Sequence, residues 1–169
     1  MQSTTGNVGV HGHAGFRGEI IVKNNFFNGS GLTIHPEDVE VHHNKFINGS
    51  VNLIGKNINF STASLVDTSL SIGSGEGQKI TNISIKHNGI LPGILYVGDK
   101  KVELDNILIK AKTTGKGLIF GNGNNENIYS RVTVEDIDRK GTVLPLGKYT
   151  QCFFEAGKIS IKQGGNMFL

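Results

Sequence analysis

The chain has 169 residues, of which 24 are glycine, 3 are proline and none is tryptophan. Its 17 Lys and Arg and 14 Asp and Glu give a formal charge of +3, and because the basic residues form no cluster, nucleic-acid binding is not favoured. The single cysteine, Cys152, excludes an intrachain disulfide, and no apolar run reaches membrane-spanning length. We therefore expect one domain with many short strands, no nucleic-acid partner and no membrane insertion.

Residues 1–19 are rich in small and polar side chains and show no clean period. They are expected to form a polar N-terminal segment or an incomplete first coil. A repeat begins at residue 20, where IIVKNNFFNGSG can be placed over VEVHHNKFINGS at an offset of 19 residues. In this alignment Ile20, Val22, Asn25 and Phe27 fall on Val39, Val41, Asn44 and Phe46.

Further copies follow the first two along the chain. First-strand pairs are expected to start at Ile58, Ile83, Ile107, Val132 and Ile159. Second apolar pairs are expected at Leu32 and Ile34, Val51 and Leu53, Leu70 and Ile72, Leu95 and Val97, and Leu144 and Leu146, with a one-residue slip to Leu118 and Phe120. This pattern predicts that residues 20–169 form an all-β parallel solenoid of about seven coils, in which each strand pairs with its counterpart one coil away.

The pattern resembles the pectate-lyase-like superfamily of right-handed parallel β-helices, and within it the segments of bacteriophage tailspikes. Members of that superfamily commonly carry an asparagine at the bend of each coil, which Asn25, Asn44 and Asn88 match. Stacked amides can bond to one another and to turn backbone that would otherwise be buried unpaired. These asparagines are therefore interpreted as a structural ladder and not as catalytic residues.

Outward residues of a solenoid also stack once per coil, so surface columns can be predicted. The column after the first inward pair is expected to contain Lys23, His42, Ser61, Lys86, Lys110, Glu135 and Lys162. Its basic members could bind an anionic polysaccharide, since aligned positive charges attract a negative polymer. Alternatively, they keep the sheet soluble and block association at its edges.

The densest acidic cluster of the chain is Glu135, Asp136 and Asp138. Glycosidases require two carboxylates at a defined separation, so these residues are the catalytic candidates if the chain is an enzyme. The sequence around these residues is also typical of a strand that continues into a solvent-exposed turn. The sequence lacks the paired-Asp, Gly-His-Gly and Arg-x-Lys motifs that the resemblance to pectinases would require.

One histidine pair is a candidate for metal chemistry. His11 and His13 alternate along the chain, so both could reach one metal, and the pair resembles the His-x-His motif that binds iron in some trimeric bacteriophage fibres and spike tips. A polar terminus without metal is the other reading. His42 and His43 are adjacent and are expected to face opposite sides of a strand, without forming one site. No other cofactor is indicated.

A solenoid needs caps at both ends, and none is evident in the sequence. We therefore expect a segment of a longer chain or a homo-oligomer, such as a trimer. The functional hypothesis is a structural β-helix segment of a tailspike or cell-surface protein that contacts a polysaccharide receptor on a virion or cell surface. The alternatives are a polysaccharide lyase, hydrolase or epimerase, and a stacking module without a ligand.

Overall fold

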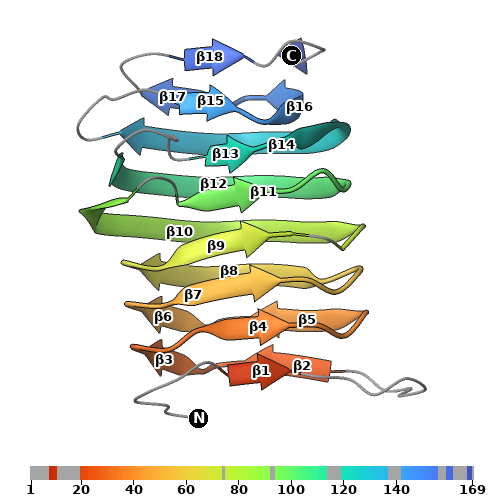
Figure 1. The fold of residues 1–169 in the computed structure, drawn as a ribbon, viewed down its shortest axis with the longest axis vertical. Coiled ribbons are helices and arrows are strands. Elements are labelled where there is room, and N and C mark those ends of the chain that lie inside the picture. Colours follow the sequence, from red (N-terminus) through yellow and green to blue (C-terminus); the bar gives the residue numbers. More distant parts are fainter. Residues whose placement is uncertain are drawn as a thin grey trace.

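The computed structural model describes residues 8–10, 20–73, 75–91, 94–113, 119–136, 142–155, 159–161 and 167–168. In this part of the chain every regular element is a β-strand, and no helix is available that could cross a membrane. The strands wind into a right-handed parallel β-solenoid of about six turns (Figure 1). The predicted fold class is therefore confirmed, with about six turns where the sequence predicted about seven coils.

Two parallel sheets make up most of the solenoid. The six-stranded sheet has the order β1 (Val8–Val10), β4 (Leu32–Ile34), β7 (Ser50–Leu53), β9 (Ser69–Ile72), β11 (Leu95–Val97) and β13 (Ile119–Gly121). The eleven-stranded sheet contains β2 (Ile20–Lys23), β3 (Phe26–Asn28), β5 (Val39–His42), β6 (Lys45–Ile47), β8 (Asn59–Val66), β10 (Gln78–Leu91), β12 (Val102–Thr113), β14 (Gly123–Asp136), β16 (Leu146–Thr150), β17 (Phe153–Glu155) and β19 (Met167–Phe168). A smaller sheet pairs β15 (Thr142–Leu144) with β18 (Ile159–Ile161).

In the described residues, seven coils of the eleven-stranded sheet each bend at a residue with left-handed backbone. All described non-glycine residues with positive φ have values between 47° and 57°. Those at the bends of this sheet are Asn24, His43, Thr62, Asn82, Asn106, Arg131 and Gln151. Asn and His adopt left-handed backbone more often than most other non-glycine residues. The bend divides each long strand into two arms and gives the solenoid a third side.

The core consists of side chains stacked one coil above another. One inward column before the bend contains Val22, Val41, Phe60, Ile80, Leu104, Tyr129 and Tyr149. A second column, after the bend, contains Phe27, Phe46, Leu65, Ile85, Ile109, Val134 and Phe154. The rings of Phe27 and Phe46 lie parallel, with centroids 4.7 Å apart. These continuous columns supply the apolar burial that a solenoid needs at every turn.

The predicted register of the eleven-stranded sheet is wrong at the step from β8 to β10, whereas the predicted starts Ile83, Ile107 and Val132 are in register with one another. Ile83 and Ile85 are paired with Ala63 and Leu65, on the arm after the bend, and not with the pair that begins at Ile58. Each long strand carries alternating apolar residues on both arms, so the two arms look alike in sequence. Choosing the wrong arm displaces the alignment of every later coil.

Two predictions for the remaining strands are also wrong. The slip to Leu118 and Phe120 does not occur, because Ile119 is in register with Leu95 and Phe120 with Tyr96. Ile119 is buried, whereas Phe120 is half-buried on the outward side. Ile159 begins β18 and pairs with Thr142, so it does not open another strand of the eleven-stranded sheet.

The predicted asparagine ladder exists, but it has two rungs. Asn25 donates from Nδ2 to Asn44 Oδ1 at 3.2 Å, and its backbone N–H donates to the same oxygen at 2.9 Å. Asn44 in turn donates to the carbonyls of Val22 and His42. The next coil places Ala63 in this slot. The assignment of Asn88 to the ladder is wrong, because Asn88 contacts Asp67 at another corner.

Candidate functional site

The outward surface of the eleven-stranded sheet holds most of the residues that the sequence singled out. The register divides the single predicted column into two columns. Before the bend, Lys23 and His42 are followed by Ser61, Thr81, Asp105, Ser130 and Thr150. After the bend, Val66 is followed by Lys86, Lys110, Glu135 and Glu155. Lys23 and His42 therefore do not share a column with Lys86 and Lys110.

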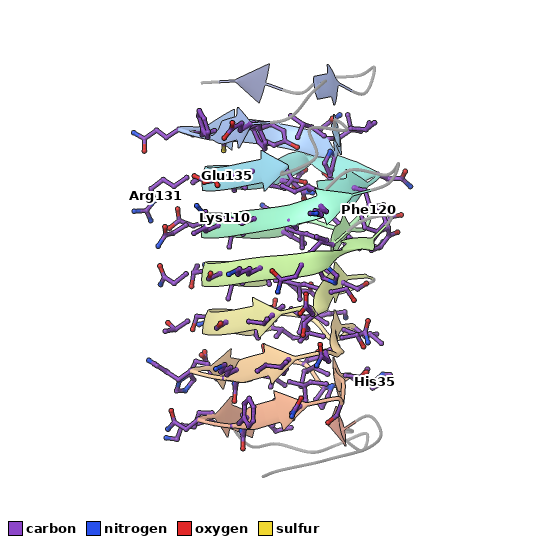
Figure 2. The ribbon with its side chains drawn as sticks, turned by 90° about the vertical axis from the view of Figure 1, so that its left-hand side faces the viewer. His35, Lys110, Phe120, Arg131 and Glu135 are labelled. Atoms are coloured by element: carbon purple, nitrogen blue, oxygen red, sulfur yellow. The ribbon has the colours of Figure 1, made fainter. Side chains whose placement is uncertain are left out.

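The second column pairs opposite charges instead of presenting a continuous basic stripe. Lys110 Nζ lies 2.9 Å from Glu135 Oε2, on the neighbouring strands β12 and β14. Figure 2 shows these two side chains next to each other on one side of the solenoid. A second pair, Lys79 and Glu103, lies one coil lower at 3.8 Å. Lys110 and Lys79 have acidic neighbours, while Lys86 lies between Val66 and Lys110. This surface therefore gives less support to an anionic ligand than a column of unpaired lysines would.

The acidic candidates are described only in part. Glu135 is half-buried and bound to Lys110, which gives its carboxylate a defined partner. Asp136 ends β14, where its backbone is in register with Ala111, but its side chain and the whole of Asp138 lie outside the described residues. The carboxylate separation that would distinguish the glycosidase mechanisms involves residues outside the described part of the chain, and the catalytic assignment stays a prediction.

The remaining sequence candidates fall outside the described part of the chain. These are His11, His13 and Lys162. Among the described residues, no group of three or more His, Cys, Asp or Glu side chains is arranged to hold a metal ion. The iron site predicted for His11 and His13 stays a prediction.

Sequence reasoning missed an ion pair at the bend. Arg131 donates from Nε to Asp105 Oδ1 at 2.9 Å, and its Nη2 also bonds to Oδ2. The hydrogen bond from Arg131 holds the pKa of Asp105 below its ordinary value. The two residues are 26 positions apart, so only the correct register reveals that they meet. Both side chains are exposed, which limits what the pair contributes to stability.

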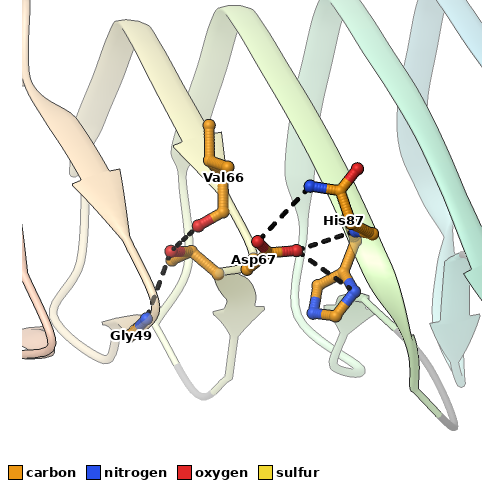
Figure 3. A network of polar contacts seen from close by, with 6 residues as sticks. Gly49, Val66, Asp67 and His87 are labelled. Atoms are coloured by element: carbon orange, nitrogen blue, oxygen red, sulfur yellow. Dashed lines mark hydrogen bonds and ion pairs between the residues drawn. The ribbon is translucent and has the colours of Figure 1, made fainter.

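A second polar cluster joins three coils at another corner (Figure 3). Thr68 accepts a hydrogen bond from the Gly49 backbone at 3.3 Å and donates one to the Val66 carbonyl at 2.8 Å. Asp67 Oδ1 accepts from the Asn88 backbone at 2.7 Å and lies 3.7 Å from Nδ1 of the buried His87. The Thr68 hydroxyl is directed to a carbonyl and not to His87. These contacts connect neighbouring coils and stabilise their stacking.

The six-stranded sheet presents an aromatic pair on its outward face. Tyr96 alternates with the buried Leu95 and Val97, so it points outward, and Phe120 lies beside it on the next coil. Their ring centroids are 5.3 Å apart and the planes are tilted by 58°. Figure 2 shows Phe120 on a different side of the solenoid from Arg131. The same outward column continues downward with the polar residues Ser71, Asn52 and Thr33.

The expectation that His42 and His43 face opposite sides is wrong. His43 is a bend residue with φ of 56°, so the chain turns between the two side chains and strict alternation is lost. The Nδ1 atoms of the two rings lie 2.7 Å apart, and the rings meet edge to face at 5.0 Å between centroids.

Comparisons of the chain with protein-family models, with curated proteins and with solved structures found no match.

Proposed function

We propose that the chain is a rigid β-helix segment of a bacteriophage tailspike or of a comparable cell-surface protein, and that it contacts a polysaccharide receptor. The contact surface is the outward face of the six-stranded sheet around Tyr96 and Phe120. The observation that carries the proposal is this pair of adjacent, half-buried rings in an outward column that continues with the polar residues Ser71, Asn52 and Thr33.

The support for a rigid segment comes from the bonding between coils. Backbone hydrogen bonds connect neighbouring coils at the corners as well as within the sheets, for example from Asp38 N to Lys56 O at 3.1 Å and from Asn48 N to Val66 O at 3.0 Å. Such a scaffold holds surface side chains at the fixed spacing of paired strands, roughly 4.8 Å. An extended polymer can then contact several coils at once without ordering a loop.

The support for a sugar ligand comes from the chemistry of the face. Aromatic rings offer an apolar surface to the C–H groups of a sugar ring, and nearby hydroxyl and amide groups can bond to its hydroxyls. Asn52 and Thr33 already bond to each other at 3.4 Å, so they are positioned side by side on this face. On the eleven-stranded sheet, Lys79 is paired with Glu103 and Lys110 with Glu135, which offsets part of its positive charge and favours a neutral glycan over a strongly anionic one.

The test is binding to a panel of bacterial surface polysaccharides, with the affinity then measured for any glycan that binds. Tyr96→Ala and Phe120→Ala should each weaken binding by about tenfold or more, as expected for a central aromatic contact. The matched control is Phe153→Ala, which removes a ring that is 58% exposed on the eleven-stranded sheet and should leave the affinity unchanged.

Three results would contradict the proposal. Binding to no polysaccharide would remove the receptor function. Equal affinity in the wild type and both aromatic variants would remove the contact surface. Cleavage of a polysaccharide that disappears in an Asp136→Asn, Asp138→Asn variant would instead establish the enzyme. The native mass in solution tests the proposed homo-oligomer, for which a trimer is expected.

A further inference from the structure

We propose that His42 and His43 form a bidentate site for a divalent transition-metal ion of the Cu²⁺ or Ni²⁺ type, bound through the Nδ1 atom of each ring. This site is separate from the glycan face proposed above. It is also separate from the His11 and His13 pair, which lies outside the described residues.

The distance between the two nitrogens suits one metal ion. At a metal–nitrogen distance of about 2.0 Å, two ligands at a right angle are ~2.8 Å apart, whereas two tetrahedral ligands are ~3.3 Å apart. The Nδ1 atoms are 2.7 Å apart and share a hydrogen bond, whose proton a metal ion would displace. This separation therefore matches neighbouring positions of a tetragonal ion more closely than those of tetrahedral zinc. The order of affinities for nitrogen ligands also favours Cu²⁺.

The backbone holds the two rings in place before a metal arrives. The His42 carbonyl accepts hydrogen bonds from the buried Asn44 side chain at 3.0 Å and from Asn24 N at 3.3 Å. His43 N–H donates to the Ser61 carbonyl one coil away at 3.3 Å. Because the bend is tied to both neighbouring coils, binding requires little ordering of the chain.

The residues around His42 and His43 determine how many ligands the protein can supply to the metal. Lys23 is in register with His42 on the coil below and Ser61 on the coil above, while Asn24 and Thr62 are the bend residues that flank His43. Glu40 is the acidic residue on the same strand, and it accepts hydrogen bonds from Asn59 at 3.1 and 3.3 Å. The protein thus supplies two imidazole ligands, and water can complete the coordination of the metal. The positive charge of Lys23 opposes the binding of a cation, so added salt should weaken this repulsion.

The experiment is a titration of the full chain, without a polyhistidine tag, with Cu²⁺ and separately with Zn²⁺. All proteins carry His11→Ala and His13→Ala, so that the N-terminal pair cannot contribute. In this background His42→Ala and His43→Ala should each weaken Cu²⁺ binding by about a hundredfold, because the second ligand no longer acts at high effective concentration. His35→Ala should leave binding unchanged.

Electron paramagnetic resonance of the Cu²⁺ complex provides a readout that does not depend on stability. The expected spectrum shows coupling to two imidazole nitrogens, reduced to one in either single variant. Thermal unfolding of the metal-free proteins confirms that each variant is folded. The proposal is overturned if the His42→Ala, His43→Ala protein binds Cu²⁺ as tightly as its parent, if the parent does not bind, or if Zn²⁺ binds more tightly than Cu²⁺.

Discussion

Gly49 lies directly over Ser30 of the preceding coil, so closely that a Cβ atom built on Gly49 would be 2.0 Å from the Ser30 carbonyl oxygen. The obstacle is backbone and cannot rotate away. Gly55 has the same relationship to Pro36, and Gly75 to Gly55. Glycine at these corners therefore permits the coils to stack at strand spacing, and the high glycine content of the chain has this specific use.

Gly49→Ala should therefore destabilise the protein by about 3 kcal/mol or more, because the two coils must separate to admit the methyl group. Chemical denaturation monitored by far-ultraviolet circular dichroism measures the effect. Gly73→Ala is the matched control, since no atom lies within 4 Å of a Cβ built there. Equal effects of the two substitutions would contradict the steric explanation.

Replacement of Asn44 tests the asparagine ladder. This side chain is 3% exposed and bonds to Asn25 and to the carbonyls of Val22 and His42. Asn44→Ala leaves these groups without their partner and should cost about 2–3 kcal/mol of unfolding free energy. Asn88→Ala, at an exposed corner, should cost under about 1 kcal/mol. A larger loss from Asn88→Ala than from Asn44→Ala would show that the ladder is not the more important contact.

The difference between Asn44 and Asn88 also shows how far sequence reasoning could reach. The first three coils repeat at nearly constant length, so the slots of Phe27, Phe46 and Asn44 were predicted correctly. Insertions begin after Ile72, and from there the chain offers apolar pairs on both arms of each long strand. Only the positions of the bends distinguish these arms. The bend residues have no common side-chain type that a pattern could detect.

The same limit applies to the candidate sites. Lys110 and Glu135 were placed correctly on adjacent coils, because both lie on the same arm. The column from Lys23 to Lys86 crossed from one arm to the other and was wrong. The meeting of His42 with His43 depends on one left-handed residue, and alternation along a strand predicts the opposite orientation. A histidine followed by a residue in left-handed backbone is a local conformation that the repeat pattern does not specify.

The stacked tyrosines of the core predict the response to alkaline pH. The rings of Tyr129 and Tyr149 are parallel at 4.5 Å, and their hydroxyls donate to the carbonyls of Leu146 and Pro145. Burial raises the pKa of both phenols well above the ordinary value of about 10. Unfolded chains ionise at that ordinary value while the folded protein does not. The contribution of these two phenols to stability is therefore constant below about pH 10 and falls above it.

Denaturation at a series of pH values should show a loss of about 1.4 kcal/mol per pH unit for each of these phenols above pH 10. Tyr149→Phe should reduce the slope by about half. Burial also raises the pKa of the Cys152 thiol, so the series is best measured with Cys152→Ser to remove that contribution. A slope that is the same in Tyr149→Phe would mean that Tyr149 does not titrate on unfolding.

The Lys110 and Glu135 pair should contribute little to stability despite its short distance. The two side chains are 48% and 32% exposed, so water screens the attraction between them. A double-mutant cycle with Lys110→Ala and Glu135→Ala should give a coupling energy of about 0.2–1 kcal/mol, decreasing with added salt. The cycle on Lys79 and Glu103, which are 3.8 Å apart, is the matched comparison and should give a smaller value.

The size of this coupling also bears on the role of Glu135. A weak, salt-sensitive coupling energy indicates that the pair mainly balances surface charge and that neither side chain fixes the position of the other. A coupling above about 2 kcal/mol would exceed the range for exposed pairs and would contradict this view. In that case the Glu135 carboxylate would be held firmly by Lys110, as a catalytic group must be, and the predicted acidic site would gain support.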